Sequence, residues 1–366
     1  MLRREHDTTL QYRDIPPSEQ HLRYLAMSTD YQIPRFSLDE IETLLKDRYQ
    51  IEGQVKLLDG ERDLNCLLDN GKSRWVFKIA NQQENPAMLD CQHQVFRLIS
   101  EQAIFRETMC AQPSINGKDI EGIVSSTGTE HNCRLLPYID GHLLSDLKPR
   151  SRALYHDLGR VLGKLDASLT GFNHPGIERP LLWDIREADD RIKEFKPLIK
   201  NARQRNLIDH FHSRYLSLVL PEQAQLRISV IHNDANDNNV IIDPNNSNQI
   251  SCLIDFGDML KTWLVAEPAI AIAYALLDED DPVECCSAIA GGYHSVFPLT
   301  TFELSVLFEL ITIRLCTSVS ICAYQKSQQP DNEYLAISEK PAWQLLERLS
   351  ELPSSRFITA IQDTCR

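Results

Sequence analysis

The chain has 366 residues, of which 42% are hydrophobic and 25% are charged, as in ordinary soluble globular proteins. Its formal net charge of −14 argues against a protein that binds nucleic acid through a broad basic face. The ten cysteines form no C-x-x-C pair and the N-terminus has no apolar signal core, so we expect reduced thiols in a cytoplasmic protein. The apolar stretch LVAEPAIAIAYALL is short and contains a glutamate and a proline, so we expect no membrane span and no membrane partner.

The N-terminal part of the chain predicts a tail, a helix and a hairpin. Residues 1–25 are polar and patternless, and we interpret them as a tail. A helix is predicted over residues 38–48, where apolar side chains recur at helical spacing behind the possible capping residue Ser37. The dipeptide Asn70-Gly71 indicates a tight hairpin turn within a group of strands. The predicted strands cover residues 54–58, 64–68 and 73–80.

The last of these strands alternates, so that Lys78 faces the opposite side of the sheet from Phe77 and Ile79. A second helix is predicted to begin at Asn85-Pro86. Its apolar stripe consists of Met88, Cys91, Val95 and Ile99. Strands followed by a helix predict a small antiparallel sheet with one main helix.

Residues 133–140, CRLLPYID, predict a strand that runs into an extended connector, and beyond it helical patterns dominate. The length of the chain fits two domains or one domain with two lobes. We therefore predict an α+β fold with an N-lobe over residues 26–138 and a larger, mostly helical C-lobe over residues 139–366.

The stretch VIHNDANDNNVIIDPNNSNQISCLIDFGD places polar side chains at fixed offsets beside short apolar strands. A hairpin through DPNNSN would bring Asn239, near the start of one strand, close to Asp255, near the end of the next. Such hard oxygen ligands suit Mg²⁺, which also binds phosphates. Asp234 on the preceding loop can reach a hydroxyl beside that metal, as phosphoryl transfer requires.

The motifs HNDANDNN and LIDFGD, with GERDLN, RLLPYIDG, LLWDI and LGKLDASLTGFNHP, resemble those of kinase-like aminoglycoside phosphotransferases and choline kinases. Within that superfamily the chain most resembles hydroxylysine kinases and their bacterial relatives, over most of its length from about residue 40. The resemblance implies a two-lobed protein-kinase-like fold. It also implies transfer of the γ-phosphoryl group of ATP or GTP, with Mg²⁺, to a hydroxyl of a small-molecule acceptor.

The resemblance assigns roles to individual residues. It implies that Asp234 is the catalytic aspartate, that Asn239 and Asp255 bind the metal, and that Lys78 binds the nucleotide phosphates. His232 has the orienting position of the catalytic loop, and it can equally be a packing histidine without direct chemistry.

Around the nucleotide, Gly60 and Asn65 belong to the turn that would cover the phosphates, although GERDLN has one glycine in place of a G-x-G-x-x-G run. Pro137 and Tyr138 resemble the hinge whose backbone would bind the nucleotide base. Asp90 is the best match for the helix carboxylate that should pair with Lys78, although a glutamate is usual there. The alternative for Asp90 is a solvated helix acid.

The acceptor is expected beside Asp234. A hydroxylysine-like acceptor carries amines and a carboxylate, so acids, an aromatic ring and an arginine are the candidate ligands. For Arg314, which lies in a largely apolar helix, the alternative is a core ion pair with an acid such as Glu309. The predicted acceptor residues are Asp237, Asp258, Glu267, Trp183, Asp184 and Arg314.

The leading interpretation is a small-molecule kinase, with 5-hydroxylysine as the first acceptor to test. A protein Ser/Thr kinase is a second interpretation, but no A-P-E segment follows the D-F-G motif. A third interpretation is a pseudokinase that only binds nucleotide. It is disfavoured because the chain has all four expected catalytic residues, Lys78, Asp234, Asn239 and Asp255.

Overall fold

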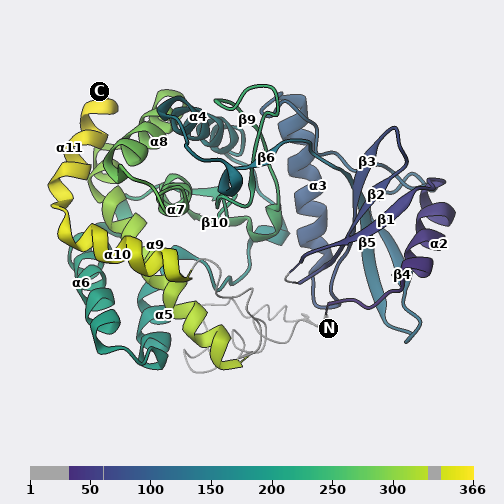
Figure 1. The fold of residues 1–366 in the computed structure, drawn as a ribbon, viewed down its shortest axis with the longest axis horizontal. Helices are drawn as coiled ribbons and strands as arrows, with labels where there is room; N and C mark the ends of the chain where they lie inside the picture. The colour runs from purple at the N-terminus through teal and green to yellow at the C-terminus, as the bar shows by residue number, and fades with distance from the viewer. Residues whose placement is uncertain (1–32, 61, 329–338) are drawn as a thin grey trace, which may run out of the picture.

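The computed structural model describes residues 33–60, 62–328 and 339–366. It consists of an antiparallel sheet with its helices and a larger helical body, with helix α3 (Pro86–Glu101) lying between them (Figure 1). The predicted α+β architecture is therefore correct. The tail predicted over residues 1–25 lies outside the described residues.

The N-terminal sheet has five antiparallel strands in the order β1-β2-β3-β5-β4. Across it Lys78 pairs in register with Asn65 on one side and Arg134 on the other. Strand β4 was not predicted from the sequence, because it is a short edge strand that contains a glycine. The strands are β1 (Gln54–Leu58), β2 (Leu64–Asp69), β3 (Arg74–Ile79), β4 (Glu121–Val124) and β5 (Glu130–Pro137).

Two helices pack beside this sheet, and both lie where the sequence predicted a helix. Helix α2 (Leu38–Tyr49) begins at a capping box formed by Ser37 and Glu40, and its Ile41 and Leu45 join the core of the sheet. Helix α3 is capped by Asn85 and buries the predicted apolar stripe toward the helical body. The sheet is therefore covered by α2 on its outer side and by α3 on its inner side (Figure 1).

The helical body surrounds two small sheets that hold the motifs of the catalytic loop. One sheet has the order β6-β8-β9 and the other pairs β7 with β10. The hairpin predicted around DPNNSN is formed by β8 and β9, in which Val240 pairs with Leu253. The strands are β6 (His142–Leu143), β7 (Ile228–Ile231), β8 (Val240–Ile242), β9 (Ile250–Leu253) and β10 (Leu260–Trp263).

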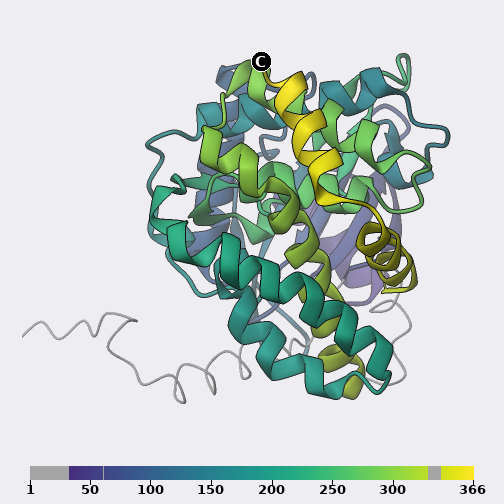
Figure 2. The same cartoon turned by 90° about the vertical axis from the view of Figure 1, so that its left-hand side faces the viewer.

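The helices around these sheets contribute most of the main hydrophobic core, and Figure 2 shows how they lie against one another. Helices α4 and α8 pack so closely that a Cβ on Gly159 would lie 1.9 Å from the Ile289 carbonyl oxygen. All ten residues of α7 are buried. The helices are α4 (Arg152–Ser168), α5 (Ala188–Phe195), α6 (Ala202–Leu218), α7 (Ala266–Ala275), α8 (Pro282–Val296), α9 (Thr301–Gln328), α10 (Glu339–Glu351) and α11 (Ser354–Thr364).

Helix α9 is the longest element of the helical body. Within the described part of the chain it alone is long and apolar enough to cross a membrane by length and composition, but 89% of that window is buried inside the protein. Its apolar character is that of a core helix. Short 3₁₀ turns connect several elements, and those near the site are η3 (Pro175–Ile177), η4 (Ile185–Glu187) and η7 (Phe256–Asp258).

Candidate active site

The β8–β9 hairpin brings the two predicted metal ligands to one end of a sheet. The N–H of Ile254 donates to the Asn239 carbonyl at 2.9 Å, so Asp255 follows directly beside Asn239. Asp255 has a φ of 62°, in the left-handed region that a non-glycine residue seldom adopts. Strained backbone of this kind is common at functional sites. The sequence therefore positioned these two residues correctly relative to each other.

His232 holds the start of the catalytic loop. Its Nε2 lies 3.0 Å from the Ile254 carbonyl, and its Nδ1 accepts the N–H of Asp234 at 3.2 Å. Complete burial lowers the pKa of His232 to about 4, so the ring is neutral, with the proton on Nε2. The edge of the ring packs against Phe256. His232 thus ties the loop to the hairpin through these two hydrogen bonds.

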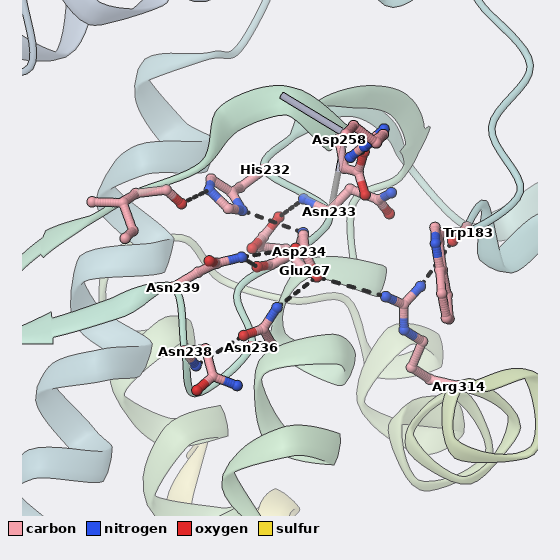
Figure 3. A network of polar contacts seen from close by, with 12 residues as sticks. Trp183, His232, Asn233, Asp234, Asn236, Asn238, Asn239, Asp258, Glu267 and Arg314 are labelled. Carbon is pink, nitrogen blue, oxygen red and sulfur yellow. Dashed lines mark hydrogen bonds and ion pairs between the residues drawn. The ribbon is translucent and has the colours of Figure 1, made fainter. Parts of the chain in front are cut away.

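Asp234 lies at the centre of the site (Figure 3). Its Oδ2 accepts a hydrogen bond from Asn239 at 2.7 Å, and its Oδ1 accepts one from Asn236 at 2.9 Å. Burial and the neighbouring Asp258 raise the pKa of Asp234 to about 8, while Arg314 acts in the opposite direction. The side chain keeps 24% of its surface exposed, so an incoming hydroxyl can reach the carboxylate.

The donors at the hairpin end fit a hard divalent cation. Lys78 holds the pKa of Asp255 down at about 2, so this carboxylate is ionised at neutral pH. The Nδ2 of Asn239 donates to Asp234, which directs the amide oxygen away from that carboxylate. Among the described residues no cluster of three or more His, Cys, Asp or Glu side chains could hold a metal by itself. An ion here would take two protein ligands, as Mg²⁺ does when phosphates and water complete its shell.

Lys78 extends from β3 toward this pair of ligands, and its Nζ lies 3.9 Å from Asp255 Oδ1. The predicted partnership of Lys78 with Asp90 is wrong. Asp90 instead lies 3.0 Å from His174 Nε2 and also accepts a hydrogen bond from Gln94. The carboxylate of Asp90 therefore contacts the loop before η3, and the only acid within ion-pair distance of Lys78 in the described chain is Asp255.

The turn before β2 is compact around its single glycine. A Cβ on Gly60 would lie 2.4 Å from Asn65 Nδ2, and that nitrogen lies 3.4 Å from the Asp59 carbonyl. Asn65 thus braces the turn from inside, and its Oδ1 is buried without a hydrogen-bond partner among the described residues. Arg62 extends from the same turn to Asp258, with 2.7 Å between Nη2 and Oδ1.

The connector after β5 begins at the residues where the sequence predicted it. Pro137 has no N–H, and the N–H of Tyr138 donates to the Arg74 carbonyl at 3.0 Å. The guanidinium of Arg74 also lies over the Tyr138 ring, 4.5 Å from its centre. Neither residue therefore has a backbone N–H left for a nucleotide base.

A comparison with known protein families identifies the family to which this chain belongs. A profile of the phosphotransferase enzyme family (APH) matches residues 54–302. The chain belongs to this family.

Relatives and solved structures agree with this assignment. Mouse (Mus musculus) hydroxylysine kinase is 26% identical over 292 residues, which cover 76% of this chain and 77% of the relative. Amicoumacin kinase hAmiN in complex with AMP-PNP, Ca²⁺ and Ami superposes with a TM-score of 0.65 at 15% identity, covering 90% of this chain and 96% of that one. A microcompartment-associated aminopropanol kinase gives 0.64 at 16% identity, covering 88% and 99%. The chain is therefore a small-molecule kinase that phosphorylates a hydroxyl group.

In this phosphotransferase the acids predicted to bind the acceptor already have partners. Asp258 pairs with Arg62, and Asp237 lies 3.9 Å from the buried guanidinium of Arg150. Both carboxylates predicted as acceptor ligands therefore already have a cation of the protein beside them.

The remaining acids are occupied in the same way. Asp184 binds Arg186 through both oxygens and accepts the hydroxyl of Thr262 at 2.7 Å. Glu267 is fully buried, and its Oε2 accepts the N–H of Asn233 at 2.9 Å. Both residues therefore bind the backbone and side chains of the protein itself.

Arg314 is the predicted acceptor residue that does reach the phosphotransferase site. Its Nη2 lies 4.0 Å from Asp234 Oδ1, and its Nη1 donates to the Trp183 carbonyl at 2.9 Å (Figure 3). The guanidinium stacks 4.8 Å from the centre of the Trp183 ring, so Arg314 occupies the place expected for an ammonium. Glu309, the alternative partner, instead pairs with Arg214.

Three residues that sequence reasoning missed contribute to this site. Asn236 bonds Asp234, Arg62 bonds Asp258, and the ring of Tyr274 lies 5.7 Å from the Arg314 guanidinium. Asn236 and Arg62 lie inside two motifs, HNDANDNN and GERDLN, that the sequence analysis had already assigned to the site. Their position within these motifs could therefore have identified them. Tyr274 gave no such signal, because it lies within an apolar run that also fits a plain core helix.

Proposed function

We propose that this kinase transfers the γ-phosphoryl group of ATP or GTP to the hydroxyl of a small amino acid, with 5-hydroxylysine as the first choice. The observation that supports this most directly is Arg314. Its side chain is 2% exposed, yet the nearest acid among the described residues is Asp234 at 4.0 Å. A buried guanidinium is stabilised by a close anion, and a substrate carboxylate beside Asp234 would supply one.

The position of Arg314 also orients such a substrate. A carboxylate bound to the guanidinium would lie next to the catalytic carboxylate, so the rest of an amino acid would extend past Asp234. In its ionised form Asp234 would then orient the hydroxyl for in-line attack and accept its proton. The net charge of −14 favours a substrate that also carries ammonium groups. The resemblance to hydroxylysine kinases supports the same choice.

The nucleotide would lie between the two parts of the fold. Lys78 would bind its phosphates, and the turn containing Gly60 and Asn65 would cover them. Asn239 and Asp255 would hold Mg²⁺, which would neutralise the charge on the transferred group. We accordingly propose that residues 26–138 form the nucleotide lobe and residues 139–366 the acceptor lobe.

We also propose that the protein works in a reducing compartment such as the cytoplasm. All ten cysteines are free thiols, and most are buried. A protein that matured in an oxidising compartment would ordinarily pair some of so many cysteines.

A substrate screen tests the proposal. Hydroxylated amino acids and the matching decarboxylated amines are offered with ATP or GTP and Mg²⁺, and phosphate transfer is measured. We expect the carboxylated acceptors to have the higher kcat/KM. Preference for the decarboxylated amines would refute the amino-acid assignment, and nucleotide binding without transfer to any acceptor would favour a pseudokinase.

A further inference from the structure

One arginine reaches from the N-terminal sheet to the segment that carries a proposed metal ligand. Arg62 lies on the turn before β2, and its Nη2 is 2.7 Å from Oδ1 of Asp258, the last residue of η7. Only 26% of the Arg62 side chain and 10% of the Asp258 side chain are exposed. Arg62 therefore joins the two parts of the fold between which the proposed function puts the nucleotide.

The guanidinium of Arg62 also lies near Asp255. A Cβ on Gly257 would lie 3.3 Å from Asp255 Oδ1 and 3.9 Å from Arg62 Nη2, so both atoms border the same small space. Of the surrounding cations, Lys78 lowers the pKa of Asp255 most, and Arg62 comes next. A phosphate group bound at Asp255 through a metal would therefore be a neighbour of the Arg62 guanidinium.

A second arginine approaches the same turn from the helical body. Arg179, on the loop after η3, donates a hydrogen bond to the Gly257 carbonyl. Burial raises the pKa of Asp258, but Arg62 and then Arg179 lower it, and the net shift is downward. Because Arg179 also compensates the charge of Asp258, Arg62 can bind another anion without leaving this carboxylate uncompensated.

We propose that Arg62 binds the γ-phosphoryl group of the nucleotide and neutralises charge on it during transfer. A guanidinium has five N–H donors in a planar fork that matches the oxygens of a phosphate group. In the transfer, the γ-phosphorus exchanges its bond to the β–γ bridging oxygen for a bond to the acceptor oxygen. The hydroxyl proton passes to Asp234, and nucleoside diphosphate leaves. Arg62 forms no covalent bond in this step and stabilises the charge that the moving group carries.

The inference rests on the proposed nucleotide site, with Lys78 and Asp255 at the phosphates, but not on the identity of the acceptor. The alternative is that Arg62 and Asp258 form an ion pair that only joins the two parts of the fold. These roles differ in their effect on nucleotides. A joining ion pair would affect nucleoside diphosphates and triphosphates alike, whereas a bond to the γ-phosphoryl group would affect only the triphosphates.

Calorimetry in the presence of Mg²⁺ tests this difference by comparing ADP with AMP-PNP and GDP with GMP-PNP. Arg62→Met should raise the Kd of AMP-PNP or GMP-PNP roughly 10- to 100-fold, as expected when a hydrogen bond to a charged group is lost. The Kd of the diphosphates should change less than about fivefold, the most that a partly exposed ion pair contributes. Arg62→Lys keeps the charge without the fork, so its loss should be smaller. Arg97→Met is the matched control, because it removes an arginine of α3 that pairs with Asp119, and it should change neither Kd.

Two binding results would overturn the inference: equal losses of diphosphate and triphosphate affinity in Arg62→Met, or no loss of either. With an acceptor that supports turnover, the kcat of Arg62→Met should fall roughly 10²- to 10³-fold, and a wild-type kcat would also overturn it. An error in the proposed nucleotide site would appear separately, as an Asp255→Ala variant whose nucleotide binding still depends on Mg²⁺.

Discussion

The two sides of Asp234 differ in how many of their charged side chains already have a partner within the protein. Toward the nucleotide, the side chain of Asp255 is 53% exposed and its nearest cation, Lys78, is 3.9 Å away. Toward the acceptor, Asp184 and Glu267 are buried and hydrogen-bonded to the protein, and Arg314 remains without a close anion. A metal and phosphates can therefore complete the first side, while on the second side the guanidinium of Arg314 can accept an anion.

This difference explains why substrate choice and chemistry would depend on separate residues. The proposed nucleotide side would use groups within two short motifs, which have to meet for phosphoryl transfer to occur. The proposed acceptor side would use one long side chain from α9, an element far away in the sequence. Changes on the first side should therefore abolish turnover, and changes on the second side should alter which acceptor is used.

The largest effect is expected on the nucleotide side. Asp255→Ala should reduce turnover by roughly 10³-fold or more, because a metal that neutralises developing charge contributes several kcal/mol to the transition state. Nucleotide binding should also lose its dependence on Mg²⁺, as measured by calorimetry with and without the metal. Asp243→Asn removes a charge from the opposite end of the same hairpin and is the matched control. Wild-type activity in Asp255→Ala would disprove the whole site assignment.

Asp234 itself, between the two sides, comes next. Asp234→Ala should lower kcat by roughly 10²–10⁴-fold, the usual contribution of a positioned acid or base. Nucleotide affinity should hardly change, because Asn239, Asp255 and Lys78 remain in place. Steady-state kinetics and nucleotide titration on the same preparation check both statements. An equal loss of nucleotide affinity would make Asp234 a nucleotide-binding or structural residue instead.

The same contrast between the two sides limits what the sequence could predict. Asn239 and Asp255 were placed correctly because a short antiparallel hairpin fixes which residues meet at its end. The sequence reached Arg314 through a chemical argument, that an arginine within an apolar helix needs an anion. It could not show that Glu309 is taken by Arg214, since that pair joins α9 to α6.

The partners of the predicted acids were hidden from the sequence for a related reason. Asp237 and Asp258 lie next to the catalytic motifs in the sequence, but proximity along the chain does not reveal partners such as Arg150 and Arg62. Asp90 lies on the expected helix, yet the direction of its side chain depends on how α3 packs against the loop holding His174. Pairings between distant elements are set by tertiary packing, which a single sequence does not display.

A sharper test of the acceptor side uses Arg314→Met. If the guanidinium binds a carboxylate, KM for a carboxylated acceptor should rise by the equivalent of about 2–5 kcal/mol, and KM for the decarboxylated amine should not. Arg214→Met is the matched control, because it removes a cation that pairs with Glu309 on the same helix. The control should lower the melting temperature more and should affect both acceptors alike.

The outcome that contradicts the substrate role of Arg314 is equally specific. If Arg314→Met melts earlier than the control and impairs both acceptors to the same degree, the guanidinium serves the core alone. The carboxylate would then be recognised elsewhere, or the true acceptor would lack one, as an amino alcohol does.

The smallest effect is expected for Asp90→Asn, on the nucleotide side. Its carboxylate is paired with His174 and is 55% exposed, and half-exposed pairs of this kind contribute about 0–1 kcal/mol to stability. Because Asp90 makes no ion pair with Lys78, the KM for nucleotide should change less than about twofold. Steady-state kinetics with varied nucleotide measure this directly, and Lys78→Met is the positive control that should raise the same KM. A rise in KM in Asp90→Asn that approaches the effect of Lys78→Met would mean that α3 turns and brings Asp90 to Lys78 when nucleotide binds. Lys78 on the nucleotide side would then be paired with an acid of the protein itself. The two sides of Asp234 would in that case differ less in how far their charges are paired.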